Sequence, residues 1–243
     1  MFKKTQPRKI DNWCPYLKYQ EKIFSNHGKY KLYINEVVNE TTNLIRGIRK
    51  EKIKIMDLGS GNGSLLNKII INLKKSRFDL SKLHIYVVDN SRDSLEDNYR
   101  KNRVFLRVET LNINLNDDFP NINNLDLILC FNTLWTLDRP AFIMEKMKKN
   151  MASDGIILLT FPWRIKNSIV IFIKELDFLL FCKIVKNFTY FLKLLHYQKK
   201  LISKKLRSFK FNDLFNFIKH NFYITKEADL FYSTIKLMVI KNK

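Results

Sequence analysis

The sequence predicts an α/β fold, built on a doubly wound and mostly parallel sheet. Two observations support this. Short apolar segments alternate with amphipathic segments over residues 53–161, and the first apolar segment ends in a turn with glycine at every second position. Such alternation is typical of parallel strands joined by covering helices. With 243 residues and 46% hydrophobic content, the chain is long and apolar enough for one such domain.

Five apolar segments are predicted as parallel strands. The fourth is almost wholly apolar, as expected of a strand that is covered on both faces. Amphipathic segments with three- and four-residue spacing are predicted as the helices between them. The strands are expected at 53–56, 83–88, 104–108, 125–131 and 156–161, and the helices at 37–48, after Gly63, at 93–101 and at 140–149.

The pattern changes after the fifth strand. A long apolar stripe at helical spacing over 168–197 predicts a helical insertion, which would form a cap over the site, a dimer interface or a membrane-surface helix. Residues 211–220 predict a closing helix. Asp154 and Gly155 are expected to form a turn before the fifth strand, and 223–226 and 231–240 a final antiparallel pair. We expect one domain over 1–243, with a helical segment 1–50, a binding core 51–164, a cap 165–210 and a closing unit 211–243.

The net charge and the cysteine spacing limit the classes of protein to which the chain can belong. The net charge of +21, from 44 basic and 23 acidic residues, suits an anionic partner, but lysine is abundant throughout and a biased genome would give the same excess. The three cysteines are far apart, which indicates a reducing compartment and no zinc site. Without an apolar signal core or a long uncharged apolar run, we expect a cytoplasmic protein.

Loops from distant parts of the chain are expected to meet at one edge of the sheet. The carboxyl ends of parallel strands share an edge, and ligands bind in the crevice outside it. The glycines of the first turn would let backbone approach a ligand closely, and the helix after it would direct free N–H groups toward that ligand. The loops at this edge contain residues 59–63, Asp89, 112–114, 131–132 and 162–163.

The spacing Asp57-x-Gly59-x-Gly61-x-Gly63 differs from the G-x-G-x-x-G of dinucleotide binders. It resembles the first motif of class I S-adenosylmethionine-dependent methyltransferases. Further segments resemble later parts of this family in the same order, namely 87–91, 125–130, 144–161 and 211–240. The resemblance implies S-adenosylmethionine as cofactor and a Rossmann-like, seven-stranded sheet with a helical insertion after the fifth strand and an antiparallel strand pair at its end.

The resemblance also implies roles at the site. Asp57 would bind the amino group of the cofactor, and Asp89 would accept hydrogen bonds from both ribose hydroxyls. Asn90 and Asn112 would lie near the adenine, with Ile113 as an apolar wall, and backbone at the end of the fourth strand would form the floor. The residues assigned to the cofactor are Asp57, Gly59, Ser60, Gly61, Gly63, Asp89, Asn90, Asn112, Ile113, Cys130 and Phe131.

The residues that face the methyl acceptor are less clearly marked. His27, in an aromatic segment that often closes over the cofactor in this family, is a candidate for catalysis or for ordinary packing. Trp135 and Trp163 follow the fourth and fifth strands, where the family places substrate contacts. They would shape an acceptor pocket, with Trp135 also a weak catalytic candidate, or they would simply pack. The sequence indicates no metal ligands.

The resemblance implies methyl transfer to a small organic acceptor. We expect an O-methyltransferase of a biosynthetic pathway, on the general frequency of that reaction alone. Residues 133–138 resemble the small-molecule and carboxylate methyltransferase branch, and the N/D-P-P-Y/F tetrapeptide of base N-methyltransferases is replaced by Phe131-Asn132-Thr133-Leu134. Three alternatives stay open: an RNA or ribosome methyltransferase that uses the lysine-rich stretch 199–210, a quinone or lipid methyltransferase whose segment 168–197 contacts a membrane surface, and a binding protein without turnover. The sequence predicts no oligomeric state.

Overall fold

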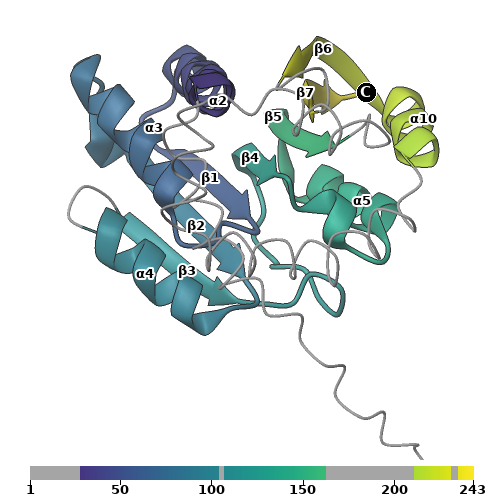
Figure 1. Cartoon of the computed structure of the whole chain (residues 1–243), viewed down its shortest axis with the longest axis horizontal. Helices are drawn as coiled ribbons and strands as arrows, with labels where there is room; N and C mark the ends of the chain where they lie inside the picture. Colours follow the sequence, from purple (N-terminus) through teal and green to yellow (C-terminus); the bar gives the residue numbers. More distant parts are fainter. Residues whose placement is uncertain (1–27, 104–106, 163–210, 231–234) are drawn as a thin grey trace, which may run out of the picture.

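The computed structural model describes residues 28–103, 107–162, 211–230 and 235–243 (Figure 1). Within these residues the chain forms a seven-stranded sheet in the order β3-β2-β1-β4-β5-β7-β6. The first five strands pair in parallel, and β7 lies antiparallel between β5 and β6. This architecture confirms the doubly wound α/β fold and the closing antiparallel pair that the sequence predicts.

The strands and helices alternate as expected over the parallel part of the sheet. The strands are β1 (Ile53–Leu58), β2 (Leu83–Asp89), β3 (Arg107–Asn112), β4 (Leu125–Phe131), β5 (Met151–Pro162), β6 (Phe222–Leu230) and β7 (Ile235–Asn242). The helices are α2 (Gly28–Gly47), α3 (Ser64–Lys75), α4 (Arg92–Asn102), α5 (Pro140–Asn150) and α10 (Phe211–Asn221), with the short 3-10 helices η1 (Leu80–Lys82) and η2 (Leu134–Thr136).

Each face of the sheet has its own hydrophobic core. In β1, Ile53 and Ile55 pack into the core beneath α2 and α3, whereas Met56 and Leu58 pack into the core beneath α5 and α10. The two sets alternate because successive side chains of a strand point to opposite faces. Helices therefore cover the sheet on both sides, and Figure 1 shows α2 and α3 apart from α5 and α10.

Several strands differ in their bounds from the sequence-based expectation, and β6 covers Phe222–Leu230 rather than 223–226. β3 begins at Arg107 rather than near residue 104, and residues 104–106 lie outside the described part of the chain. β5 runs from Met151 to Pro162 in one strand, so Asp154 and Gly155 form no separate turn. Instead its register against β4 shifts here, because Met151 pairs with Leu125 and Ile156 already pairs with Leu127. The predicted turn is a bulge inside the strand.

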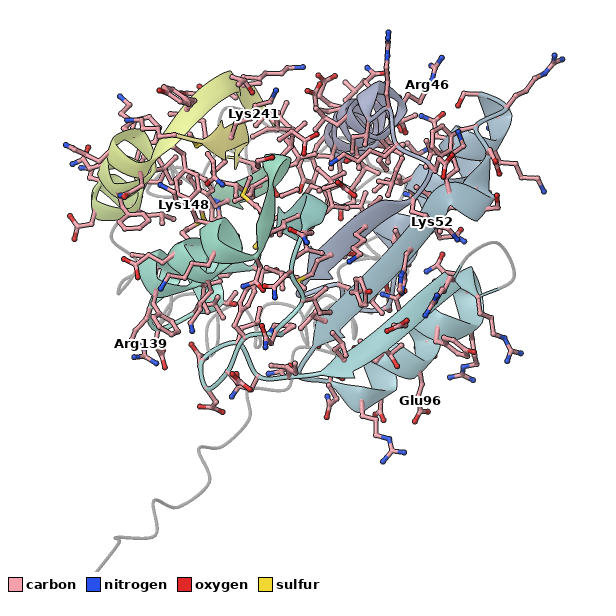
Figure 2. All side chains as sticks on the ribbon, turned by 180° about the vertical axis from the view of Figure 1, so that it is seen from behind. Arg46, Lys52, Glu96, Arg139, Lys148 and Lys241 are labelled. Atoms are coloured by element: carbon pink, nitrogen blue, oxygen red, sulfur yellow. The ribbon has the colours of Figure 1, made fainter. Side chains whose placement is uncertain are left out.

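Basic side chains are spread over several elements. Figure 2 shows Arg46 on α2, Arg139 at the start of α5 and Lys241 on β7, all on different parts of the surface. The lysine-rich stretch 199–210 lies outside the described residues, so its contribution to a basic surface stays a prediction. In the part of the chain that the structure describes, no helix combines the length and the hydropathy needed to cross a membrane.

The bulge in β5 gives a first testable prediction. A Cβ atom on Gly155 would lie 2.7 Å from the carbonyl oxygen of Leu125 and 3.0 Å from that of Ala152, and neither backbone atom can move freely. Gly155→Ala should therefore lower the free energy of unfolding by about 1–3 kcal/mol in a urea titration.

Gly47→Ala is the matched control, because a Cβ atom on Gly47 meets nothing within 4 Å. At the end of a helix, alanine should leave stability unchanged or raise it by up to ~1 kcal/mol. Equal destabilisation by both substitutions would show that the close approach at Gly155 is not the cause.

Candidate active site

The turn after β1 is bent by three glycines. Gly59, Gly61 and Gly63 have φ angles of 68°, 53° and 72°, which lie in the left-handed region that favours glycine. The backbone N–H groups of Gly59 and Ser60 both donate to the carbonyl oxygen of Val88, at 2.8 and 3.1 Å. The chain thus leaves β1 toward the end of β2. This places the turn at the carboxyl edge, where β1 lies between β2 and β4 and the winding of the sheet reverses.

The carboxylate of Asp89, the last residue of β2, fastens the turn. One of its oxygens accepts from the N–H of Gly61 at 2.9 Å, and the other accepts from the N–H of Ser91 at 2.9 Å. The N–H of Ser64, where α3 begins, donates to the side chain of Asn62 at 3.2 Å. Of the helix N–H groups that were expected to face the ligand, that of Ser64 is therefore bonded within the protein instead.

Two buried asparagines of α4 hold the other side of the turn, and the sequence analysis missed both. Asn98 and Asn102 donate to the carbonyl oxygens of Gly61 and Gly63, at 3.4 and 3.5 Å. A Cβ atom on Gly63 would collide with the Asn98 side chain. The signal for these residues is their four-residue spacing with Ser94 on the buried face of a polar helix, where asparagine needs internal partners.

The site contains two acidic side chains in a poorly solvated environment. Burial, followed by the charge of Asp89, raises the pKa of Asp57 to about 7. Burial also raises the pKa of Asp89, although the N–H groups of Ser91 and Gly61 oppose the shift by stabilising its carboxylate. Both shifts show that negative charge is unfavourable here without a ligand. The site is therefore suited to a ligand that carries positive charge.

The end of β3 lies next to Asp89. Asn112 pairs with Asp89 across the two strands, and its side-chain amide donates to the carbonyl oxygen of Asp89 at 3.2 Å. The N–H of Ile113 donates to the same oxygen at 3.1 Å. The structure thus brings Asn112 and Ile113 beside the end of β2, as predicted, while Asn90 is half-buried in the loop that follows it. Their contacts with adenine stay a prediction.

The end of β4 completes the edge. Cys130 is fully buried, and burial, together with the charge of Asp57, raises the pKa of its thiol to about 12, so the thiol is protonated at neutral pH. Phe131 is half-buried, and the hydroxyl of Thr133 donates to the carbonyl oxygen of Leu58 at 3.1 Å. This last bond ties the loop after β4 to the start of the glycine turn.

Trp135 lies inside the protein rather than at the edge. Its side chain is 8% exposed and belongs to the core beneath α5 and α10. This burial favours the packing interpretation of Trp135 over the acceptor-pocket interpretation. His27, Trp163 and the cap 165–210 lie outside the described residues, so their proposed roles stay predictions.

A hydrogen-bonded group next to the glycine turn was not anticipated. Asn132, directly after β4, has a φ angle of 54°, and its side-chain amide donates to the hydroxyl of Tyr33 on α2 at 2.8 Å. The backbone N–H of Asn132 donates to the carbonyl oxygen of Thr160 on β5 at 2.8 Å. Three elements therefore meet at one residue. The only sequence signal is an asparagine directly after an apolar strand.

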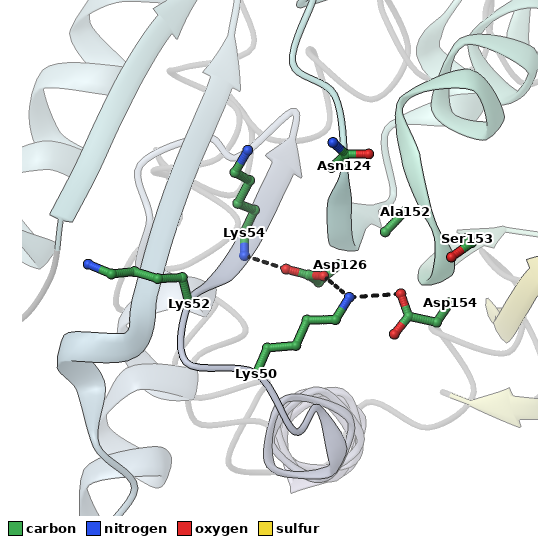
Figure 3. Close-up of a pocket in the computed structure, with 8 residues that line it drawn as sticks. All are labelled: Lys50, Lys52, Lys54, Asn124, Asp126, Ala152, Ser153 and Asp154. Atoms are coloured by element: carbon green, nitrogen blue, oxygen red, sulfur yellow. Dashed lines mark hydrogen bonds and ion pairs between the residues drawn. The ribbon is translucent and has the colours of Figure 1, made fainter.

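A concave region lies at the opposite edge of the sheet (Figure 3). This open pocket of about 360 Å³ is at the amino ends of β1 and β4. Lys50 lies between Asp126 and Asp154, with nitrogen–oxygen distances of 2.6 and 2.8 Å, and Asp126 also accepts from the backbone N–H of Lys54 at 2.8 Å. These contacts join β1, β4 and β5. We interpret the pocket as structural, because the candidate cofactor residues lie at the other edge.

The described residues contain no group of three or more histidine, cysteine, aspartate or glutamate side chains arranged to hold a metal ion.

Comparison with known families identifies the class of protein. Residues 49–214 match the model of a family described as a methyltransferase domain. The match covers more than half of the chain and includes the glycine turn, Asp89 and the end of β4. The chain therefore belongs to this family, as an S-adenosylmethionine-dependent methyltransferase of class I. No curated protein sequence matches the chain.

Solved structures share the fold at low sequence identity. The N-methyltransferase NodS from Bradyrhizobium japonicum WM9, in complex with S-adenosyl-L-homocysteine, is similar over 94% of this chain and 98% of that one, with a TM-score of 0.60 and 9% identity. A methyltransferase from Aquifex aeolicus is similar over 96% of this chain and 98% of that one, with a TM-score of 0.58 and 14% identity. The CurJ carbon methyltransferase is similar over 93% of this chain and 57% of that one, with a TM-score of 0.60 and 13% identity. At this identity the likeness shows the fold alone.

The raised pKa of Asp57 predicts how stability depends on pH. In the folded protein without a ligand this carboxyl binds a proton up to about pH 7, whereas its ordinary pKa is 3.8. The folded state thus holds more protons than the unfolded state between these values, so raising the pH across this window lowers the free energy of unfolding. Asp57→Asn should remove this loss and stabilise the protein at pH 8, by on the order of 1–3 kcal/mol.

Urea titrations at pH 5 and pH 8 measure the effect. Asp154→Asn is the control, because Asp154 is exposed and Lys50 holds its pKa below the ordinary value. The control should not gain stability at pH 8. If Asp57→Asn kept the pH dependence of the wild-type protein, the buried carboxyl would not be its source.

Proposed function

We propose that the protein transfers the methyl group of S-adenosylmethionine to a small organic acceptor, with oxygen as the methylated atom. The observation that carries the choice of methyl donor is the pair of acidic side chains beside the glycine turn, buried Asp57 and half-buried Asp89, both with a raised pKa. S-adenosylmethionine carries a positive sulfonium, an ammonium group and a ribose diol. The ammonium group and the ribose diol each have a suited partner among the residues at the carboxyl edge.

Asp57 and Asp89 would take different parts of the cofactor. A bound ammonium group would stabilise the Asp57 carboxylate and offset the burial that raises its pKa. Each oxygen of Asp89 accepts one backbone N–H and, as a carboxylate oxygen, retains a further lone pair for a ribose hydroxyl. The buried hydroxyl of Ser60 accepts and donates no hydrogen bond among the described residues, so it is a further polar group at this edge.

The same contacts argue against a dinucleotide. A pyrophosphate binds where backbone N–H groups point at it. Here the N–H groups of Gly59 and Ser60 are bonded to Val88, and that of Gly61 is bonded to Asp89. Two acidic side chains would also repel the phosphates. The turn therefore favours a cationic ligand over an anionic one.

The chemistry places few demands on the protein. When bound, S-adenosylmethionine supplies a methyl group that is already activated by the sulfonium, so this chain's residues mainly hold and align the two reactants. Neither Cys130 nor Tyr33 is a free base at neutral pH, because burial raises the pKa of both groups above their ordinary values. Alignment, rather than proton removal by these groups, is the role that the described residues support.

The proposal for the acceptor rests on fewer observations than the proposal for the methyl donor. Residues 133–138 resemble the small-molecule branch of the family, and the structure describes all of them. Methyltransferases with a similar fold methylate different atoms, since NodS is an N-methyltransferase and CurJ is a carbon methyltransferase. The choice of oxygen therefore needs a direct test.

Cofactor binding is tested by calorimetry with S-adenosylmethionine. The wild-type protein should bind it and should not bind NAD. Asp89→Ala should weaken binding by about 10–100-fold, because a hydrogen bond to a charged group contributes about 1.5–3 kcal/mol. Asp154→Ala, at the opposite edge of the sheet, should bind normally. Unchanged binding by Asp89→Ala would contradict the ribose assignment.

Acceptor identity is tested by incubating the protein with methyl-labelled S-adenosylmethionine and a fractionated small-molecule extract of cells that make it. Label should enter a small-molecule fraction, and mass spectrometry of the product should place the methyl group on oxygen. Label that enters only RNA or lipid fractions would contradict the proposed acceptor class and support one of the alternatives.

A further inference from the structure

We propose that the amino edge of the sheet, which lies opposite the candidate active site, binds single-stranded nucleic acid through exposed basic side chains and one exposed aromatic ring. The amino edge comprises the loops before β1, β2 and β5, the end of β7 and the start of β6. This binding is separate from methyl transfer and does not depend on the proposed function.

Basic side chains follow one another along the amino edge. Lys52 precedes β1 and Lys82 precedes β2, and these two strands pair from their first residues onward. Lys241, near the end of β7, pairs with Tyr223 of β6. Adjacent strands lie about 4.8 Å apart, so the edge from β2 to β6 extends over about 24 Å. The exposed residues of this basic row are Arg49, Lys52, Arg77, Lys82 and Lys241.

The positive charge of the basic row is not neutralised within the part of the chain that the structure describes. None of its members forms an ion pair there. Lys50 differs, because Asp126 and Asp154 hold its amine at 2.6 and 2.8 Å. Figure 3 shows the side chain of Lys52 pointing away from these two aspartates. Exposed cations that have no carboxylate partner attract an anionic ligand.

The opposite edge of the sheet carries the opposite charge. The carboxyl ends of the strands and the loops after them contain Asp57, Asp89, Asp117, Asp118 and Asp138. Arg92 and Arg139 lie toward the same edge, but acidic residues predominate. A biased genome would raise the lysine content on every surface alike and would not separate acidic from basic residues. Composition alone therefore does not explain the basic row.

Helix ends explain only part of the positive charge at the amino edge. Basic side chains stabilise the negative end of a helix, and the last turns of α2, α3, α5 and α10 all contain them. Lys148 and Lys243 also donate to backbone carbonyl oxygens at the end of α10, at 2.9 and 2.7 Å. The members of the basic row lie outside the α-helices, so this stabilisation does not account for them.

An exposed tyrosine indicates which kind of anion fits the edge. Tyr223 is 59% exposed at the start of β6, and the amine of Lys243 lies 5.8 Å from the centre of its ring. In proteins that bind single-stranded nucleic acid, bases stack on aromatic rings while neighbouring cations contact the phosphates. Tyr223 and the basic row supply both parts of this arrangement.

A bilayer fits the same edge less well. Attachment to a membrane surface needs a continuous apolar face that enters the lipid. Among the described residues, the exposed large apolar side chains toward this edge are Ile71 on α3 and Tyr223 on β6. The two are far apart, because α3 packs over β1 and β2 whereas β6 is the last strand on the other side of the sheet. Separate apolar side chains among cations suit bases better than acyl chains.

Fluorescence anisotropy with a labelled oligouridylate of about 20 nucleotides tests the proposal. The triple variant Arg49→Gln, Lys52→Gln and Lys241→Gln should bind about tenfold or more weakly than the wild-type protein at about 50 mM salt. The slope of log affinity against log salt concentration should become shallower by about 2, because each phosphate contact contributes about 0.7. All three side chains are exposed, so the melting temperature should stay within a few degrees of the wild-type value.

The control removes the same charge from the other end of the molecule. Lys31→Gln, Arg92→Gln and Arg139→Gln, combined in one variant, replace exposed residues that lie toward the carboxyl edge. The affinity of this variant for the oligouridylate should differ from that of the wild-type protein by less than about threefold.

Tyr223 tests the stacking part of the proposal. Tyr223→Ala should weaken oligouridylate binding by about fivefold or more, because one base loses its aromatic partner. Tyr223→Phe retains the ring and removes only the hydroxyl, so it should bind as the wild-type protein does. Equal affinities of all three proteins would contradict a stacked base at this position.

The two edges of the sheet should bind their ligands independently. β1 has six residues, so about 20 Å of strand separates the amino edge from the glycine turn. Saturating S-adenosylhomocysteine should therefore leave the affinity for the oligouridylate within about twofold. The oligouridylate should also acquire no label from methyl-labelled S-adenosylmethionine.

Several outcomes would overturn the proposal. Equal losses in the triple variant and its control would show that binding follows net charge, and full binding by both would place the contact elsewhere. Competition by S-adenosylhomocysteine would place the nucleic acid at the carboxyl edge. A wild-type protein that binds phosphatidylserine vesicles and no oligouridylate would have a membrane as its partner. Failure to bind S-adenosylmethionine would instead contradict the proposed function, and the oligouridylate measurements would still apply.

Discussion

The site depends on one backbone connection, in which the carbonyl oxygen of Val88 accepts N–H groups from Gly59 and Ser60. This contact turns the chain as it leaves β1 and requires the positive φ angle at Gly59. The Asp89 carboxylate then fixes Gly61 from the same strand end, and α4 covers the turn from the other side through Asn98. The turn is therefore shaped by its neighbours in space rather than by its own sequence alone.

The internal use of these N–H groups changes how the glycine motif should be interpreted. A glycine turn with free N–H groups suits phosphate. This turn has the same bend, but the N–H groups of Gly59, Ser60 and Gly61 already donate to acceptors within the protein. What it offers a ligand is close backbone approach and two carboxylates whose pKa values are raised by burial. A positively charged ligand would offset the burial that raises the pKa of Asp57.

Much of the fold follows from local pattern, and β4 shows why. Its apolar run has well-defined ends and matches the predicted 125–131, because a strand buried on both faces tolerates few polar residues. The bulge in β5 was misread as a turn, since Asp-Gly signals a bend without saying whether pairing continues. At the site, motif spacing located Asp57 and Asp89. It could not locate Asn98, Tyr33 or Asn132, whose roles arise from hydrogen bonds between distant segments.

The placement of β7 affects how the protein is made. β5 has β4 on one side and β7 on the other, and β7 follows every other strand in the chain. While the chain is being synthesised, the parallel strands are complete before β7 emerges, so one side of β5 presents unpaired N–H and C=O groups. Such an edge pairs readily with other chains. Synthesis that stalls before residue 235 would thus leave a nearly complete domain that is prone to aggregate.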